Sequence, residues 1–452
     1  MSDSPPIGAP LAELHLHLYG CIRPAALLDI MAAAEPQWLY WGDYEKAMLR
    51  AYGAIPPTRE LLERYRRNDP KAQQEFEEFV VMNEMGTGNF ARFLARSTLP
   101  AVASIRRKPG GATPAEIAAE VAAMVASIRS DHERQGIAYA EFRCMLGSDL
   151  RTEEHRTVVD ALLTEYAEGT TERLVLSLDR TDPWPGWERV QELALGPYGH
   201  VLVGVDFCGI EEGHPPKEVA ELFASIGAFN RAHPDRALAI LHHVGESFAD
   251  KSLESAVRWV QEAAELGAHR LGHAIALGVD PAAYGTHERI ESVSERRDQI
   301  MYDLQHAAAL GGLGVRIDAR ELRGELADLA SLPPDAVIEL AYDETRLDEV
   351  RLRQYYAITR VRATGAVVEV CPTSNRRIGA ITDPAHHPVH RFHAEGLPFV
   401  VSSDNPGIFG TSLLEEVDWV CAQIGGGVTL RDELLSRAWR SRSEVLSARA
   451  QG

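Results

Sequence analysis

The sequence is poor in the features that mark secreted, membrane-bound and disulfide-stabilised proteins. It has five cysteines in 452 residues, and none of them forms a CxxC pair, so neither a disulfide framework nor a zinc knuckle is expected. The opening segment MSDSPPIGAP has no basic region followed by an apolar one, and no apolar run elsewhere is long enough to cross a bilayer. We therefore expect a cytoplasmic protein without a membrane partner.

Basic residues are also scarce relative to acidic ones. The chain has 46 Lys and Arg against 66 Asp and Glu, a formal net charge of -20. Because such a surface repels a phosphate backbone, we expect no nucleic-acid partner. What is present, 45% hydrophobic and 25% charged residues, is typical of a globular protein with a sizeable core. This length allows one large domain with insertions, or two or three ordinary domains.

Eight short apolar runs have strand length, and most are rich in the residues of a strand that is buried on both faces. Helix-like segments with apolar residues every three or four positions separate them. This alternation predicts an α/β fold of the (β/α)8 TIM-barrel type. An open doubly wound sheet is the alternative, although no glycine-rich dinucleotide loop follows any of the strands. The predicted strands are Leu11–Leu18, Ile137–Met145, Arg173–Asp179, His200–Cys208, Ala237–Val244, His269–Ala274, Ala366–Pro372 and Pro398–Asp404.

Two connections are much longer than those of a plain barrel. After strand 1, residues 36–100 mix aromatic and charged side chains and predict a helical insertion over the barrel mouth. After strand 6, residues 278–362 predict a longer helical insertion, with helices over Ser294–Leu310 and Leu347–Arg362. We interpret both as insertions in a single domain that spans residues 1–452. The second insertion could reshape the pocket mouth or form the contact of a homo-oligomer.

Four elements carry side chains suited to chemistry. His15 and His17 are two residues apart on a strand, so both rings face the same side. His243 and Glu246 follow strand 5, where a ligand and a proton-transfer group can stand side by side. His273 and Asp404 come at the ends of strands 6 and 8. Each element alone could be structural, but all four fall on the face where barrel active sites lie.

Three imidazoles and a carboxylate suit one Zn²⁺ ion, with a further position open for water. A water bound in this way reaches a pKa of about 7 and provides hydroxide near neutral pH. Its attack needs a base and an acid, roles that fit His273 and Glu246. Another divalent transition metal is the alternative to zinc.

The sequence resembles the adenosine deaminase family of the metal-dependent amidohydrolase superfamily. The resemblance extends from the first strand to beyond the eighth. Its main motifs are LHLH with Gly20, HVGE at His243–Glu246, LGH at Leu271–His273 and SSDNPGIFGTSL at Ser402–Leu413. Its supporting motifs are YAEFR at Tyr139–Arg143, GVDFCG at Gly204–Gly209 and EVCPTSN at Glu369–Asn375.

The resemblance implies a zinc-dependent enzyme of purine metabolism that replaces an exocyclic amino group with oxygen and releases ammonia. It implies that Glu246 is protonated and hydrogen-bonds a ring nitrogen, while His273 orients the attacking water and accepts its proton. The backbone N–H of Gly209 would bind another ring nitrogen. The implied metal ligands are His15, His17, His243 and Asp404.

Two substrate-side positions depart from the family pattern. Tyr19 stands where an aspartate commonly meets the sugar, and Asn405 stands where a second aspartate commonly meets the purine. An asparagine amide can still donate to a ring nitrogen. The leading hypothesis is an adenosine-like 6-aminopurine nucleoside, with water as co-substrate. The alternatives are another aminated heterocycle (a modified purine, a free purine base or a pterin), and a barrel without catalysis that works as a binding or assembly module.

Overall fold

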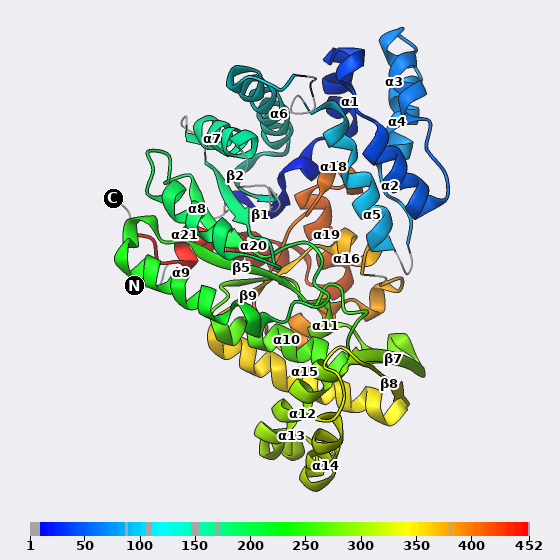
Figure 1. Cartoon of the computed structure of the whole chain (residues 1–452), viewed down its shortest axis with the longest axis vertical. Coiled ribbons are helices and arrows are strands. Elements are labelled where there is room, and N and C mark those ends of the chain that lie inside the picture. The colour runs from blue at the N-terminus through cyan, green and yellow to red at the C-terminus, as the bar shows by residue number, and fades with distance from the viewer. Residues whose placement is uncertain are drawn as a thin grey trace.

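Eight parallel strands form the centre of the molecule in the computed structural model (Figure 1). The structure describes residues 10–85, 89–104, 108, 110–145, 153–167, 171–379 and 381–450. The predicted (β/α)8 barrel is confirmed, and every strand begins and ends within three residues of the expected bounds. In sheet order they are β1 (Leu11–His17), β2 (Ile137–Met145), β3 (Glu172–Ser177), β4 (Leu202–Asp206), β5 (Ala239–Val244), β6 (Arg270–His273), β9 (Val367–Val370) and β10 (Phe399–Val401).

The barrel closes between β1 and the residues that follow β10. Leu16 and Asp404 form a parallel bridge. The backbone N–H of His17 donates to the carbonyl of Asp404 over 2.9 Å, and the N–H of Asp404 donates to the carbonyl of His15 over 3.0 Å. The closing contact therefore brings the histidines of the first strand next to the aspartate that follows the last.

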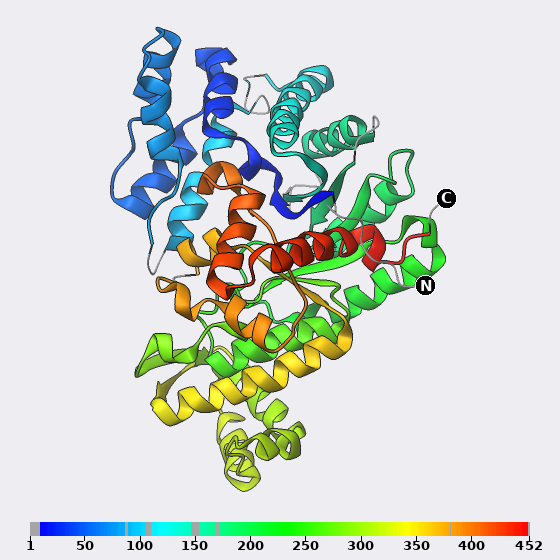
Figure 2. The same ribbon diagram turned by 180° about the vertical axis from the view of Figure 1, so that it is seen from behind.

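The helices that surround the barrel begin and end at residues suited to those positions. For example, Thr113 and Glu116 form a capping box at the start of one helix, which ends at Gly136 with φ 71°. Figure 2 shows the last long helix lying across the back of the molecule. The surrounding helices are α6 (Pro114–Gln135), α7 (Glu153–Ala167), α8 (Trp184–Ala194), α9 (Ala220–Ala232), α10 (Leu253–Leu266), α11 (Ile275–Gly278), α15 (Glu344–Thr364), α16 (Pro372–Arg377), α17 (Pro388–Ala394), α18 (Pro406–Phe409), α19 (Leu413–Ile424), α20 (Gly427–Arg440) and α21 (Ser443–Leu446).

The connection after β1 consists of helices that gather at one end of the molecule (Figure 1). Phe76, Leu61 and Met48 of this group are buried against the barrel's own apolar cluster. Residues 86–88 of this connection lie outside the described part of the chain. The helices are α1 (Pro24–Ala33), α2 (Gly42–Tyr52), α3 (Thr58–Arg66), α4 (Ala72–Val80) and α5 (Asn89–Ser97).

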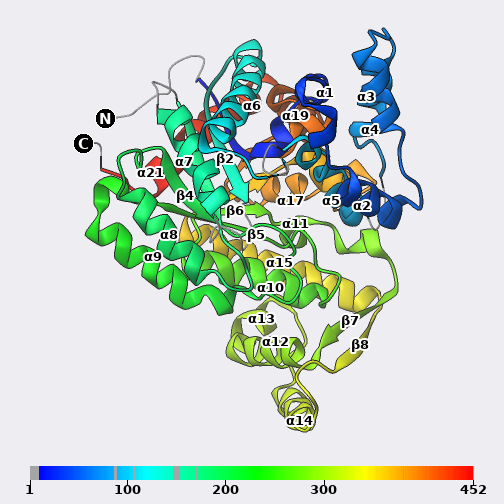
Figure 3. The same cartoon turned by 45° about the horizontal axis from the view of Figure 1, so that its top comes forward.

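The connection after β6 projects from the opposite end, as Figures 1 and 3 both show. It contains α12 (Val293–Gln305), α13 (Ala307–Leu313) and α14 (Ala319–Leu329). It also contains a two-stranded antiparallel sheet of β7 (His287–Ser292) and β8 (Val337–Tyr342), which the sequence patterns did not predict. Among the described helices, none combines the length and the apolarity that crossing a membrane requires.

Candidate active site and metal centre

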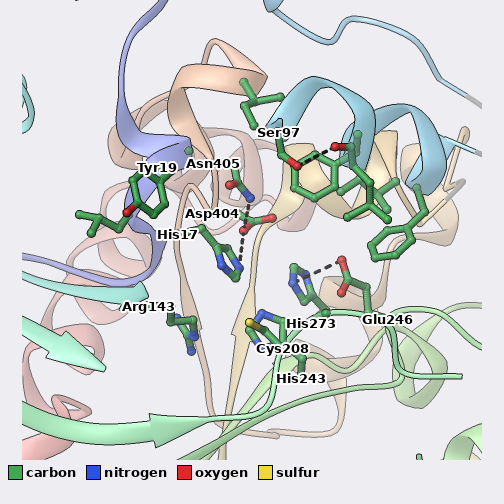
Figure 4. A pocket seen from close by; sticks show the side chains of 18 residues that line it. His17, Tyr19, Ser97, Arg143, Cys208, His243, Glu246, His273, Asp404 and Asn405 are labelled. Atoms are coloured by element: carbon green, nitrogen blue, oxygen red, sulfur yellow. Dashed lines mark hydrogen bonds and ion pairs between the residues drawn. The ribbon is translucent and has the colours of Figure 1, made fainter. Parts of the chain in front are cut away.

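Four histidine rings converge at the carboxyl ends of β1, β5 and β6. The ring centroid of His15 lies 5.5 Å from that of His17, 4.7 Å from that of His243 and 4.8 Å from that of His273. Gly272 makes this approach feasible, since a Cβ there would lie 3.1 Å from the ring of His243 and 3.3 Å from that of His15. Asp404 joins the cluster with its Oδ1 3.3 Å from Nε2 of His17 (Figure 4).

Buried acceptors fix the tautomers of three of these rings. The Nδ1–H of His15 donates to Glu369 over 2.9 Å, and the Nδ1–H of His243 donates to Asp206 over 3.1 Å. The Nδ1–H of His273 donates to the amide oxygen of Asn375 over 2.9 Å. Each ring therefore turns an unprotonated Nε2 toward the cluster, as a carboxylate–histidine pair does in metal sites.

The nitrogen and oxygen atoms that face each other in this cluster carry lone pairs that can bind a cation. Nε2 of His15 and Nε2 of His243 are 3.1 Å apart, although neither carries a proton to share. Nε2 of His15 lies 3.7 Å from Asp404 Oδ1. In a tetrahedral zinc site with bonds of about 2.0–2.1 Å, neighbouring ligand atoms are about 3.3 Å apart. The distances between these donor atoms are close to that value. The donors fit one Zn²⁺ ion or a similar divalent ion.

The protonation states favour metal binding as well. Burial, reinforced by the nearby Arg143, lowers the pKa of His15 well below its usual value. Burial likewise lowers the pKa of His243 to about 4, so both imidazoles are neutral near pH 7. Cys371 lies near His273 and Asp404, but burial raises the pKa of its thiol well above the usual range. The histidines and Asp404 form the main set of donors, and Cys371 lies beside them.

Glu246 and His273 stand together beside this cluster. Nε2 of His273 lies 3.5 Å from Oε1 of Glu246, whose side chain is 11% exposed. Burial, with the neighbouring charge of Glu211, raises the pKa of Glu246 to about 8. A carboxyl group that is protonated at neutral pH therefore faces an imidazole nitrogen that can accept a proton.

Two of these residues have strained backbones. His273 has φ 62° and Asp404 has φ 63°, values in the left-handed region that non-glycine residues seldom adopt. Such strain is found where the surroundings hold a functional side chain in one orientation. Here it turns both side chains into the pocket.

Glu211 holds the loop that carries Glu246. Its carboxylate accepts the backbone N–H groups of Gly245, Glu246 and Ser247 over 2.9, 3.1 and 3.3 Å. The side chain of Glu211 is buried, with the ammonium of Lys251 4.0 Å away. This clamp fixes the direction of Glu246 and places a like charge near it.

The cluster opens into a cavity of about 210 Å³. The residues predicted to meet the substrate line it: Tyr19, Gly209 and Asn405. Gly209 has φ 87°, a turn that glycine accommodates readily. The amide of Asn405 donates to Asp404 over 2.7 Å, so one of its two donors is directed to a candidate metal ligand. The remaining walls include Phe90, Phe93, Leu94, Ile378 and Ile408.

Comparison with known proteins relates parts of this chain to deaminases. Residues 337–434 match the model of the family described as adenosine deaminase. The chain is 41% identical over 86 residues to an aminodeoxyfutalosine deaminase of Acidothermus cellulolyticus, covering 18% of this chain and 24% of that protein. It is 29% identical over 174 residues to an adenine deaminase of Sinorhizobium medicae, covering 38% and 48%.

Over part of its length, this chain is therefore similar to proteins of the adenosine deaminase family. A solved structure of an adenine deaminase from Arthrobacter aurescens shares its fold, with a TM-score of 0.53 and 17% identity over 97% of both chains. The N6-mAMP deaminase of arabidopsis is similar, with a TM-score of 0.52 and 16% identity over 96% of this chain and 93% of that one. The sequence matches span less than half the length of the curated relatives above.

Sequence reasoning missed the residues that support the candidate metal donors. Asp206, Glu369 and Asn375 lay within the quoted motifs but were given no role. A signal was present, because charged residues inside apolar strands must be paired when they are buried. Arg143 meets that need: it contacts Glu369, and its Nε lies 3.1 Å from Asp206. One arginine thus anchors both carboxylates that orient His15 and His243.

Proposed function

We propose that this protein is a metal-dependent hydrolase that replaces the exocyclic amino group of a 6-aminopurine with oxygen and releases ammonia. An adenosine-like nucleoside is the leading substrate. The observation that carries the proposal is the position of Glu246, a carboxyl with a raised pKa, 3.5 Å from Nε2 of His273. A cluster of metal donors lies alongside.

Hydrolytic deamination requires the chemistry of each of these groups. His15, His17, His243 and Asp404 would hold the ion, which when bound acidifies a water molecule. His273 accepts the proton of the attacking water at Nε2. Glu246 donates to the ring nitrogen beside the reacting carbon, so that negative charge does not build up on the ring. His273 passes the proton that it accepted to the amino group, the carbon–nitrogen bond breaks and ammonia leaves. The water oxygen remains on the ring, and its second proton restores Glu246.

The free base adenine is the second candidate. Two solved or curated relatives carry the name adenine deaminase, and Tyr19 occupies a position at which the family pattern has a sugar-binding aspartate. Two other candidates, a different aminated heterocycle and a barrel that only binds, are separated by the same experiment. Ammonia release is followed with adenine, adenosine, a pterin and other aminated heterocycles on metal-loaded protein.

The decisive variant is Glu246→Gln. We expect kcat to fall at least about 100-fold, because the amide cannot transfer a proton, while the metal content stays near that of the unchanged protein. Glu218→Gln, at an exposed position outside the cavity, serves as the control and should remain fully active. Full activity of Glu246→Gln would contradict the acid role, and absence of turnover with every compound would favour the binding-only barrel.

A further inference from the structure

Another cavity lies at the opposite end of the barrel from the histidine cluster, at the amino ends of β3, β4 and β5. It measures about 650 Å³. Arg173 stands at the start of β3, His200 and Arg236 precede β4 and β5, and residues of the segment 442–450 line the rest. Figures 1 and 3 both show α21, which belongs to that segment, on the side of the molecule away from the helices that follow β1. We call this space the basal cavity.

The basal cavity is rich in arginine, although the chain as a whole has a net charge of -20. Four arginines, one histidine and two acids line it, which leaves a surplus of two positive charges when the histidine is neutral. A concave surface with one sign of charge concentrates ions of the opposite sign. The arginines are Arg173, Arg236, Arg442 and Arg449, and the acids are Asp235 and Glu444.

Each of the two acids stands beside one arginine. Oε1 of Glu444 lies 3.0 Å from Nε of Arg173, and Oδ2 of Asp235 lies 3.6 Å from Nε of Arg236. In the part of the chain that the structure describes, the other two arginines have no carboxylate oxygen within 4.0 Å of a guanidinium nitrogen. Their charges therefore form the surplus of the cavity.

Arg449 has occupied donors but an uncompensated charge. Its guanidinium donates to the backbone carbonyls of His200, Ala237 and Leu202 over 3.0, 3.0 and 2.6 Å. Partial burial, followed by the charges of three of the four arginines, lowers the pKa of His200. The positive charges thus meet at one wall of the cavity without being neutralised.

Arg442 is held in place while its terminal nitrogens stay unused. Its Nε donates to the carbonyl of Trp439 over 2.9 Å, and its Cζ lies 3.9 Å from the ring centroid of Trp439 and 5.1 Å from that of Tyr139. Among the described residues, neither terminal nitrogen of Arg442 has a hydrogen-bond partner. A guanidinium fixed by stacking can bind the oxygens of a phosphate with two parallel N–H groups.

The backbone on both sides of Arg442 is anchored as well. The carbonyl of Ser441 accepts Nη1 of Arg270 over 2.9 Å, and the N–H of Ser443 donates to Glu141 over 2.7 Å. Arg270 and Glu141 are fully buried and contact each other. Arg442 therefore extends from a rigid base, which lowers the entropic cost of binding a ligand.

The charge and the size of the basal cavity indicate the class of its ligand. A phosphate group carries a charge of about -1.5 to -2 near pH 7, which matches the surplus of two positive charges. Sites for small molecules commonly have volumes of about 300–1,000 Å³, so the cavity has room for more than the phosphate itself. Val445, Ala448 and Ala450 provide apolar surface for the remainder of the molecule.

We propose that the basal cavity binds the phosphate group of a small molecule. Arg442 supplies the hydrogen bonds, and Arg449 and Arg236 supply further positive charge. Two sources share this chemistry: inorganic phosphate, and a phosphate ester such as a sugar phosphate or a nucleotide. The site does not depend on the proposed deamination, because it lies at the other end of the barrel.

Calorimetric titration of the metal-loaded full chain tests the proposal. One arm compares ribose 5-phosphate with ribose, another compares CMP with cytidine, and the third uses inorganic phosphate. At least one ester should bind about tenfold more tightly than its counterpart without phosphate, since charged hydrogen bonds are worth about that factor. Inorganic phosphate that binds as tightly as the esters identifies the free anion as the source. No difference within either pair, together with no binding of inorganic phosphate, overturns the proposal.

A charge-neutral variant connects the binding to the basal cavity. Arg442→Gln should weaken binding of the phosphate compound about tenfold. Arg440→Gln removes the same charge from an exposed position two residues earlier, outside the cavity, and should bind like the unchanged protein. Equal losses in both variants, or no loss in Arg442→Gln, contradict the assignment.

A variant of opposite effect guards against a loss of binding that reflects misfolding. Glu444→Gln removes a negative charge from the lining and should tighten binding of the phosphate compound about two- to fivefold. Unchanged or weaker binding, in a variant with the circular dichroism spectrum of the unchanged protein, contradicts the proposal. None of these measurements needs turnover, so their failure leaves the proposed function untouched, and failure of the proposed function leaves the basal cavity untouched.

Discussion

At the residue scale, Glu246 owes its properties to its neighbours. Glu211 accepts three consecutive backbone N–H groups of the loop that carries Glu246, and its charge is the second cause, after burial, of the raised pKa of Glu246. Glu212 contributes in the same direction but less. Glu211 thus orients Glu246 and keeps it protonated, although Glu211 itself does not line the cavity.

This arrangement predicts a specific pH dependence. Glu246 works in its protonated form, so kcat/KM should fall as pH rises through about 8. In Glu211→Gln the like charge is lost, the pKa of Glu246 falls, and the decline should begin at lower pH. Glu212→Gln, the control, should move the decline by less. A pH profile of Glu211→Gln identical to that of the unchanged protein would show that Glu211 does not act on Glu246.

Gly20 provides a second test at this scale. A Cβ at this position would lie 1.9 Å from the amide oxygen of Asn405, whose amide donates to Asp404. Gly20→Ala should displace Asn405 and lower kcat/KM about two- to tenfold, the value of one hydrogen bond. Gly312→Ala, where an added Cβ meets nothing within 4 Å, should have no effect. Unchanged kinetics of Gly20→Ala would mean that Asn405 does not contribute to the reaction.

At the element scale, the projection after β6 has a small core of its own. Val293, Ile300 and Leu329 form a buried cluster with partly buried neighbours from α12, α14 and β8. Burial alternates along the two strands of its sheet, but their sequences, HERIES and VIELAY, do not alternate charged and apolar residues. Three helices separate the two strands in the sequence, so no short hairpin turn indicated that the strands pair. Sequence patterns therefore predicted a helix over Ser294–Leu310, where α12 and α13 lie, and missed α14 and the sheet.

The separate core predicts that the projection can be weakened without harm to the site. Ile300 is fully buried, so Ile300→Ala should cost about 2–5 kcal/mol of local stability. Metal content and kcat should stay unchanged. Urea unfolding and kinetics check this, with Met301→Ala as the control because Met301 is 49% exposed. A loss of kcat in Ile300→Ala would show instead that the projection supports the cavity.

At the scale of the whole molecule, buried charges connect strands across the barrel. Arg143 on β2 contacts Glu369 on β9 and Asp206 on β4. Arg270 on β6 has its Nε 2.8 Å from Glu369 and also contacts Glu141 on β2. All five side chains are buried. Burying so many charges costs free energy unless each is paired, and these pairs fix the strands that carry the metal donors.

Metal removal should therefore affect the stability of the whole fold. An ion that binds only the folded chain stabilises it by about 2.7 kcal/mol at 100 times its dissociation constant. Dialysis against a chelator should lower Tm, and added Zn²⁺ should restore it. Asp404→Ala should show neither the loss nor the recovery. A Tm that is the same with and without chelator, in protein shown to have lost its metal, would argue against a metal at this site.

The sequence by itself determined the eight strands, the side on which His15 and His17 face, and the positions of His243, Glu246, His273 and Asp404 at strand ends. These features are local, because strand periodicity and short motifs depend on residues close in the chain. Only the tertiary structure decided that Asp206, Glu369 and Asn375 fix the imidazole tautomers, that Glu211 holds the loop of Glu246, and that Tyr19 and Ser97 line two neighbouring cavities. Those contacts join segments far apart in sequence, and barrel closure and strand register decide which of them meet.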